Sequence, residues 1–95
     1  MKHEELITST EYFLVKTQND VYNLVNDYME REGLSKVELA KQWSMSEDYI
    51  SQILNGDFNG SLENFMDIAY RTNHVVNITF LSRDEYLTKR RNNNE

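Results

Sequence analysis

The sequence predicts a mainly α-helical domain of five helices, with a long first helix and one C-terminal β-strand. Apolar residues recur at helical spacing through most of the chain, and Ser, Thr and Gly stand where helices begin and end. A single β-branched run, 75–80, partly alternates as strands do. The 95 residues make one domain, 1–95, with a core over 10–72 and a C-terminal part over 73–95. We expect 92–95 to be frayed.

The composition limits the classes of function that are open to the chain. No Cys is present, which excludes disulfides, thiol nucleophiles and Cys-ligated zinc. His3 and His74 belong to no cluster with metal-ligand spacing, and there is no phosphate-binding glycine loop, so we expect no metal, no cofactor and no enzyme. Without an apolar leader or a run near the roughly 20 residues that span a membrane, the sequence predicts a cytoplasmic protein.

The net charge of −6 bears on nucleic-acid binding. Residues 1–32 carry a net charge of −4, residues 33–60 carry −2, and residues 61–95 balance to zero, with the basic cluster 89–91 near the end. Affinity for nucleic acids comes largely from neutralising phosphates. The charge distribution therefore argues against tight binding to DNA.

The first predicted helix covers about 10–31. Thr8 and Glu11 have the spacing of a capping box at its start, and Gly33 is placed to end it in a left-handed conformation. The apolar residues 12–15 point around the whole helix, so either this end folds over the core or it is a surface for self-association. The predicted buried stripe comprises Val21, Leu24, Val25, Tyr28 and Met29.

Two short helices follow, over about 36–43 and 47–54, joined by the turn 44–46. Ser35 and Glu38 form a capping box for the first of these helices. Ser46 is a good N-cap for the second, and Gly56 is its C-terminal stop. The apolar residues of the pair are Val37, Leu39, Ala40, Trp43, Tyr49, Ile50, Ile53 and Leu54.

The C-terminal third predicts a helix, a strand and a last short helix. The helix covers about 62–71 and is expected to bury Leu62, Phe65, Met66, Ile68 and Ala69. A lone strand leaves its backbone groups unpaired, so we expect it to pair with the same strand of a second copy. The predicted dimerisation residues are Val75, Val76, Ile78 and Phe80. Ser82 and Glu85 form a third capping box, which opens a helix to about Lys89.

The stretch 34–56, with the residues LSKVELAKQWSMSEDYISQILNG, resembles the Xre family, also called the Cro/phage-repressor helix-turn-helix family. The continuation 61–69, SLENFMDIA, is similar to the fourth helix of that family. One departure is Ser44, because the family usually has Gly in this turn and Ser adopts a left-handed conformation only at a cost. The resemblance implies a repressor-like domain of a small bacterial or phage regulator, some relatives being antitoxins that repress their own operon.

The resemblance also implies a transcriptional repressor that binds double-stranded DNA as a homodimer, with the helix 46–55 in the major groove. Gln52 is suited to adenine, whereas Lys36 and Ser46 are suited to phosphates. The residues implied to contact DNA are Lys36, Ser46, Glu47, Asp48, Tyr49, Ser51, Gln52 and Asn55.

Glu47 and Asp48 keep an alternative function open. Acidic residues stabilise the start of a helix, but in a groove they would face the phosphate charge of DNA. The alternative is a protein-binding helix-turn-helix module, an antitoxin or a phage inhibitor, whose acidic surface docks a partner protein. Duplex binding that weakens steeply with salt would favour DNA as the partner.

Overall fold

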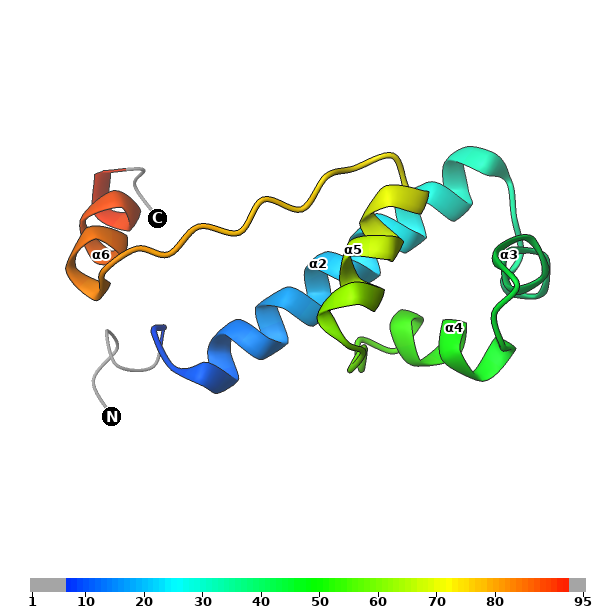
Figure 1. Ribbon diagram of the computed structural model, residues 1–95, viewed down its shortest axis with the longest axis horizontal. Helices are drawn as coiled ribbons and strands as arrows, with labels where there is room; N and C mark the ends of the chain where they lie inside the picture. Colours follow the sequence, from blue (N-terminus) through cyan, green and yellow to red (C-terminus); the bar gives the residue numbers. More distant parts are fainter. Residues whose placement is uncertain (1–6, 93–95) are drawn as a thin grey trace.

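The computed structural model describes residues 7–92, in which five helices are joined by short turns and one long extended segment (Figure 1). The prediction of a mainly helical domain is confirmed. The molecule is elongated, with dimensions of 44 × 24 × 23 Å. Its helices are α2 (Thr10–Glu32), α3 (Lys36–Trp43), α4 (Glu47–Leu54), α5 (Leu62–Arg71) and α6 (Arg83–Asn92).

The core lies between the second half of α2 and the helices α3, α4 and α5. α2 packs against α4 and α5, and α3 packs against α4. Of the predicted stripe on α2, Val21 and Val25 are fully buried, while Leu24, Tyr28 and Met29 are half-buried. Phe58, in the loop after α4, completes the core. The core residues are Val21, Val25, Leu39, Ala40, Trp43, Ile50, Ile53, Phe58 and Ile68.

Trp43 joins three helices at the end of this core. Its ring centre lies 5.6 Å from that of Tyr28 on α2, and the guanidinium carbon of Arg71 on α5 lies 5.8 Å from the ring centre. Arg71 is held in turn by Asp67, with Nε 2.8 Å from a carboxylate oxygen. The indole therefore contacts the helix before α3 and the helix after α4.

Local capping sets most of the helix boundaries. The predicted boxes are confirmed at Ser35–Glu38 and at Ser82–Glu85, where each side chain bonds to the other residue's backbone N–H. The predicted box of Thr8 and Glu11 is wrong, because Ser9 caps α2 and its Oγ accepts from the N–H of Tyr12 at 3.1 Å.

The predicted burial of the apolar face of α5 is only partly correct. Ile68 and Ala69 are buried, but Leu62 is 60% exposed and Met66 is 44% exposed. These two residues and Tyr70 are four residues apart and so share one side of the helix. α5 packs against α2 along its other side, which leaves this stripe uncovered.

The predicted strand at 75–80 is not found between residues 7 and 92. Residues 74–82 run in an extended conformation from the end of α5 to α6 (Figure 1), and no part of 7–92 forms a β-strand. The reason is that a strand requires a second extended segment, and residues 7–92 offer none to pair with it. The part over 73–92 is thus an extended segment followed by a helix.

The first half of α2 projects beyond the core, and α6 lies beside its first turns (Figure 1). The rings of Phe13 and Tyr86 meet edge to face, with centres 5.4 Å apart. The Arg90 side chain of α6 also lies close to Tyr12 and Tyr86. Residues 12–15 do not fold over the core, and their role in self-association stays a prediction.

No helix between residues 7 and 92 has the length and the hydropathy needed to cross a bilayer. Two predictions concern residues outside the described part of the chain. They are the absence of a leader in the N-terminal segment, which includes His3, and the frayed end at 93–95.

Candidate nucleic-acid interface

A tight turn joins α3 to α4 and sets the two helices at a steep angle. In Figure 1, α3 is seen almost along its axis, whereas α4 runs across the view. Ser44 ends α3 in the left-handed conformation, with φ 55° and ψ 45°, despite the cost of this conformation for Ser. The N–H of Met45 donates to the carbonyl of Ala40 at 2.9 Å, which closes the end of α3.

The inner face of α4 is locked into the core. Ile50 and Ile53 are completely buried, as is Leu39 on α3. Ala40 is also buried at the crossing of the helices, where its small side chain allows close approach. At the start of α4, the Ser46 Oγ accepts from the N–H of Tyr49 at 3.0 Å. Packing and capping together therefore fix which face of α4 points outward.

The outward face of α4 is polar and borders an open hollow, which we call the α4 hollow. Asp48, Gln52 and Asn55 are exposed on it, and Ser51 is half-buried. Six of the eight predicted DNA-contact residues line this hollow: Ser46, Asp48, Tyr49, Ser51, Gln52 and Asn55. Glu47 is exposed beside it, at the first turn of the helix.

Asp57 also lines the α4 hollow and was missed by the sequence reasoning. Gly56, with φ 80°, turns the chain so that the N–H of Asp57 donates to the carbonyl of Gln52 at 2.9 Å. The signal that would have found it is the Asn-Gly-Asp turn directly after the helix. A further carboxylate thus lies at the C-terminal end of α4.

Tyr49 lies differently from the other residues at this face. Its ring is half-buried against the core, and its centre is 6.4 Å from that of Phe58. The hydroxyl oxygen is buried and has no hydrogen-bond partner. Burial raises the pKa of Tyr49, and the Asp67 carboxylate adds to the rise. Tyr49 thus offers the hollow an edge of its ring, and no exposed hydroxyl.

Lys36 lies at the other side of the outward face. Its Nζ donates to the Ser51 Oγ at 2.9 Å, and the pair is exposed. The ammonium at the start of α3 is therefore held next to the middle of α4. This contact brings Lys36, the last of the eight predicted residues, to the site.

The electrostatics of the site are mixed. Glu38 accepts from the N–H of Ser35 at 2.8 Å, and this bond, followed by that with the Ser35 side chain, lowers the pKa of the carboxyl group. Glu47, Asp48 and Asp57 add three exposed carboxylates along α4. Residues 7–92 contain no cluster of His, Cys, Asp and Glu that could hold a metal ion.

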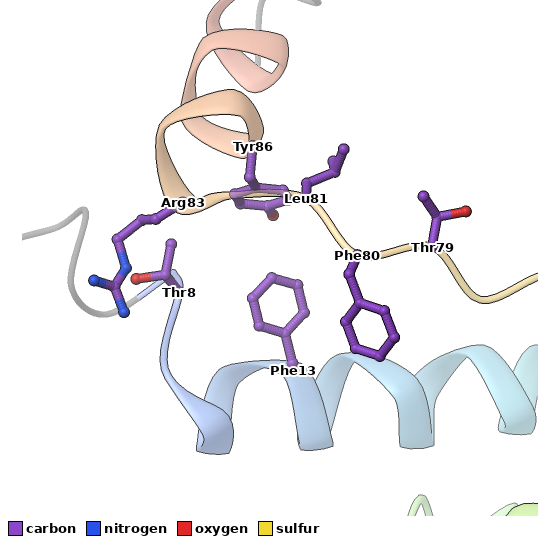
Figure 2. Close-up of a pocket in the computed structure, with 7 residues that line it drawn as sticks. All are labelled: Thr8, Phe13, Thr79, Phe80, Leu81, Arg83 and Tyr86. Atoms are coloured by element: carbon purple, nitrogen blue, oxygen red, sulfur yellow. The ribbon is translucent and has the colours of Figure 1, made fainter.

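The predicted dimerisation residues lie far from α4, on the extended segment. Val75 is 91% exposed, Phe80 is 93% exposed and Ile78 is 49% exposed, while Val76 is half-buried. Phe80 borders a hollow of about 440 Å³ between this segment, α6 and the start of α2 (Figure 2). The structure thus separates the DNA-contact candidates from the dimerisation candidates.

Comparison with known proteins adds no relative to this description. No protein-family model, curated protein or solved structure matches the chain.

Proposed function

We propose that the chain is a DNA-binding transcriptional repressor that reads an operator with the helix 46–55. The observation that carries the proposal is the contrast between the two faces of α4. Ile50 and Ile53 are fully buried, whereas Asp48, Gln52 and Asn55 are exposed. A helix with its inner face locked and amide and hydroxyl groups outside matches the requirements of the major groove.

Four of the candidate residues have a defined role in this proposal. The Gln52 amide reads adenine through its N6 and N7 atoms, and Asp48 accepts from the amino group of cytosine. Lys36 and Ser46 bind phosphates on either side of the helix. Because Lys36 and Lys41 are the two cations of α3, neutralising two phosphates gives a salt slope of about −1.8 per copy.

The test is binding of the purified chain to duplex DNA from the region upstream of its own gene, measured by fluorescence anisotropy. Gln52→Ala should weaken binding roughly 5- to 150-fold, the cost of one base contact of about 1–3 kcal/mol. The melting temperature should stay nearly unchanged, since Gln52 is exposed. Asn23→Ala, at an exposed amide on α2, is the matched control and should bind as the unmodified chain does. Unaltered binding by Gln52→Ala would refute this docking.

A second candidate function is docking of a partner protein, and the charge beside α4 favours it. Glu47, Asp48 and Asp57 are three exposed carboxylates. Lys36, the cation nearest to them in the proposal, already donates to Ser51. An acidic surface of this kind is suited to a basic protein surface, as in an antitoxin or a phage inhibitor.

One double variant separates the two functions. Glu47→Gln with Asp48→Asn removes two negative charges from the outward face of α4 and keeps the side-chain size. If DNA is the partner, the variant should bind duplex more tightly, because repulsion from the phosphates is removed. If a basic protein is the partner, its capture should fall and no duplex binding should appear.

A further inference from the structure

The exposed apolar surface of the molecule lies away from α3 and α4. Among residues 7–92, eleven large hydrophobic side chains are exposed. Three of them are on the first half of α2, three on α5 and four on the segment 74–82, and the remaining one is Val37 on α3. Apolar surface gathered in this way marks an interaction site more often than a free surface.

The segment 74–82 is held extended at both ends. After Asn73, with φ 69°, the N–H of His74 donates to the carbonyl of Ala69 at 2.7 Å. At the other end, Ser82 belongs to the capping box of α6. Between these anchors the segment pairs with no other strand within 7–92. It therefore presents backbone donors and acceptors to a strand from outside.

The residues of the segment form a palindrome of apolar and polar positions. The order 75–81 is Val, Val, Asn, Ile, Thr, Phe, Leu. When each residue is classed only as apolar or polar, this pattern is symmetric about Ile78. Antiparallel pairing about a two-fold axis at Ile78 sets Phe80 opposite Val76 of the second copy, an aromatic and β-branched pair that stabilises sheets. The same register sets Val75 opposite Leu81 and Asn77 opposite Thr79.

Other centres of symmetry do not pair like with like. A two-fold axis at Asn77 sets Val75 opposite Thr79, and an axis at Thr79 sets Asn77 opposite Leu81. Residues 72–82 include no Asp, Glu, Lys or Arg, so repulsion between these residue types opposes no register of the segment. The pattern therefore selects one register for self-pairing.

We propose that the segment 74–82 pairs antiparallel with the same segment of a second copy of this chain, with Ile78 on the two-fold axis. The occupant of the exposed segment is thus a second copy, in an isologous interface. The proposal stands on the segment's own pattern and does not depend on binding to DNA.

In the proposed dimer, the first turns of α2 supply contact area beyond that of the two paired segments. Burial of one aromatic side chain such as Phe80 removes roughly 150–250 Å² from water. A stable interface needs about 800 Å² from each partner, and a two-stranded ribbon alone is marginal. Figure 2 shows Phe80 directed toward α2 and Phe13, whereas Thr79 and Leu81 point the other way. The Phe80 side of the ribbon therefore faces the exposed Phe13 of α2.

The first test is the mass in solution, measured by sedimentation equilibrium without DNA. The unmodified chain should sediment at twice 11.3 kDa. Ile78→Lys places two ammonium groups opposite each other on the axis and should weaken the dimer by about tenfold or more. Val37→Lys is the matched control, because Val37 is 44% exposed and Ile78 is 49% exposed, and its dimer should be unchanged. Circular dichroism checks that both variants are folded.

The second test fixes the register by disulfide trapping, which is clean because the chain contains no Cys. Ile78→Cys should be cross-linked by oxidised glutathione, since residues opposite each other lie within the reach of a disulfide. Val75→Cys should not, since its two copies lie roughly 20 Å apart in this register. Random collision would favour Val75→Cys, because Val75 is 91% exposed. A monomeric unmodified chain, or preferred cross-linking of Val75→Cys, would overturn the proposal.

Discussion

Ser44 carries a conformational cost that a single substitution can remove. It is one of two residues other than Gly with positive φ among 7–92, at φ 55°, and it is exposed. In this conformation the Cβ of an L-residue crowds the following carbonyl oxygen. Ser44→Gly removes the Cβ while the turn between α3 and α4 keeps its shape.

The magnitude follows from two opposing terms. The left-handed conformation costs roughly 1–2 kcal/mol for a residue with a Cβ. Removing this cost by a change to Gly is offset by about 0.4–1 kcal/mol, because Gly gives the unfolded chain more conformational freedom and so stabilises the unfolded state. We therefore expect Ser44→Gly to raise the free energy of unfolding by about 0.5–1 kcal/mol, which is roughly 2–8 °C in melting temperature for a domain of this size.

The assay is urea unfolding followed by circular dichroism, with thermal unfolding as a second measure. Gly33→Ala gives the reverse experiment, because Gly33 has φ 66° and a Cβ there would meet nothing within 4 Å. It should lose stability by about 1 kcal/mol for conformational reasons alone. Asn73→Gly, at φ 69°, should gain less than Ser44→Gly, because Asn tolerates this conformation.

Ser44→Ala separates the effect of the backbone conformation on stability from the effect of the hydroxyl group. It keeps the Cβ and the strain, so its free energy of unfolding should stay close to that of the unmodified chain. If Ser44→Gly and Ser44→Ala shift the urea midpoint equally, the backbone conformation is not the source of the change. A loss of stability in Ser44→Gly would refute the reasoning outright.

Two further predictions concern titratable groups. Tyr49→Phe should raise the free energy of unfolding by up to about 1 kcal/mol and so move the urea midpoint higher, because the buried hydroxyl has no hydrogen-bond partner. Since the pKa of Tyr49 is raised, the unmodified chain should lose stability as the pH rises above 10.0, and Tyr49→Phe should lose less over the same titration. Glu38→Gln tests the lowered pKa of Glu38, whose contribution is present above pH 4.5 and is lost as the pH falls below it. The difference in melting temperature from the unmodified chain should therefore shrink in acid, and a constant difference would exclude the capping carboxylate as its cause.

The helices were predictable because their signals are local. Ser35 and Glu38 are three residues apart, and both bonds of their box form within one turn. The exchange of Ser9 for the predicted Thr8 shows the limit of this reasoning, since adjacent hydroxyl residues offer the same chemistry. The face of α5 that meets the core depends on α2, so the exposure of Leu62 and Met66 was not predictable from periodicity alone.

Contacts between distant residues account for the remaining differences. Phe58 lies in a loop, yet it is buried, and its carbonyl accepts from the Gln18 amide of α2 at 2.9 Å. No local pattern marks a loop residue as part of the core. The expected strand required a partner segment, and the described part of the chain contains none. In the candidate site, spacing placed Gln52 and Asn55 correctly on one face, but the inward hydroxyl of Tyr49 depended on Phe58 and Asp67.

In the proposed dimer, the projecting first half of α2 links helix order to protein concentration. Its second half is clamped by the buried Val21 and Val25, whereas Phe13, Leu14 and Val15 in its first turns are exposed. Backbone hydrogen bonds with so few buried neighbours open at low free energy. A second copy that packs against Phe13 binds only the ordered helix, so association raises the free energy of opening by mass action. Amide exchange over residues 13–17 should then slow as the chain is concentrated, while exchange around Val25 stays constant.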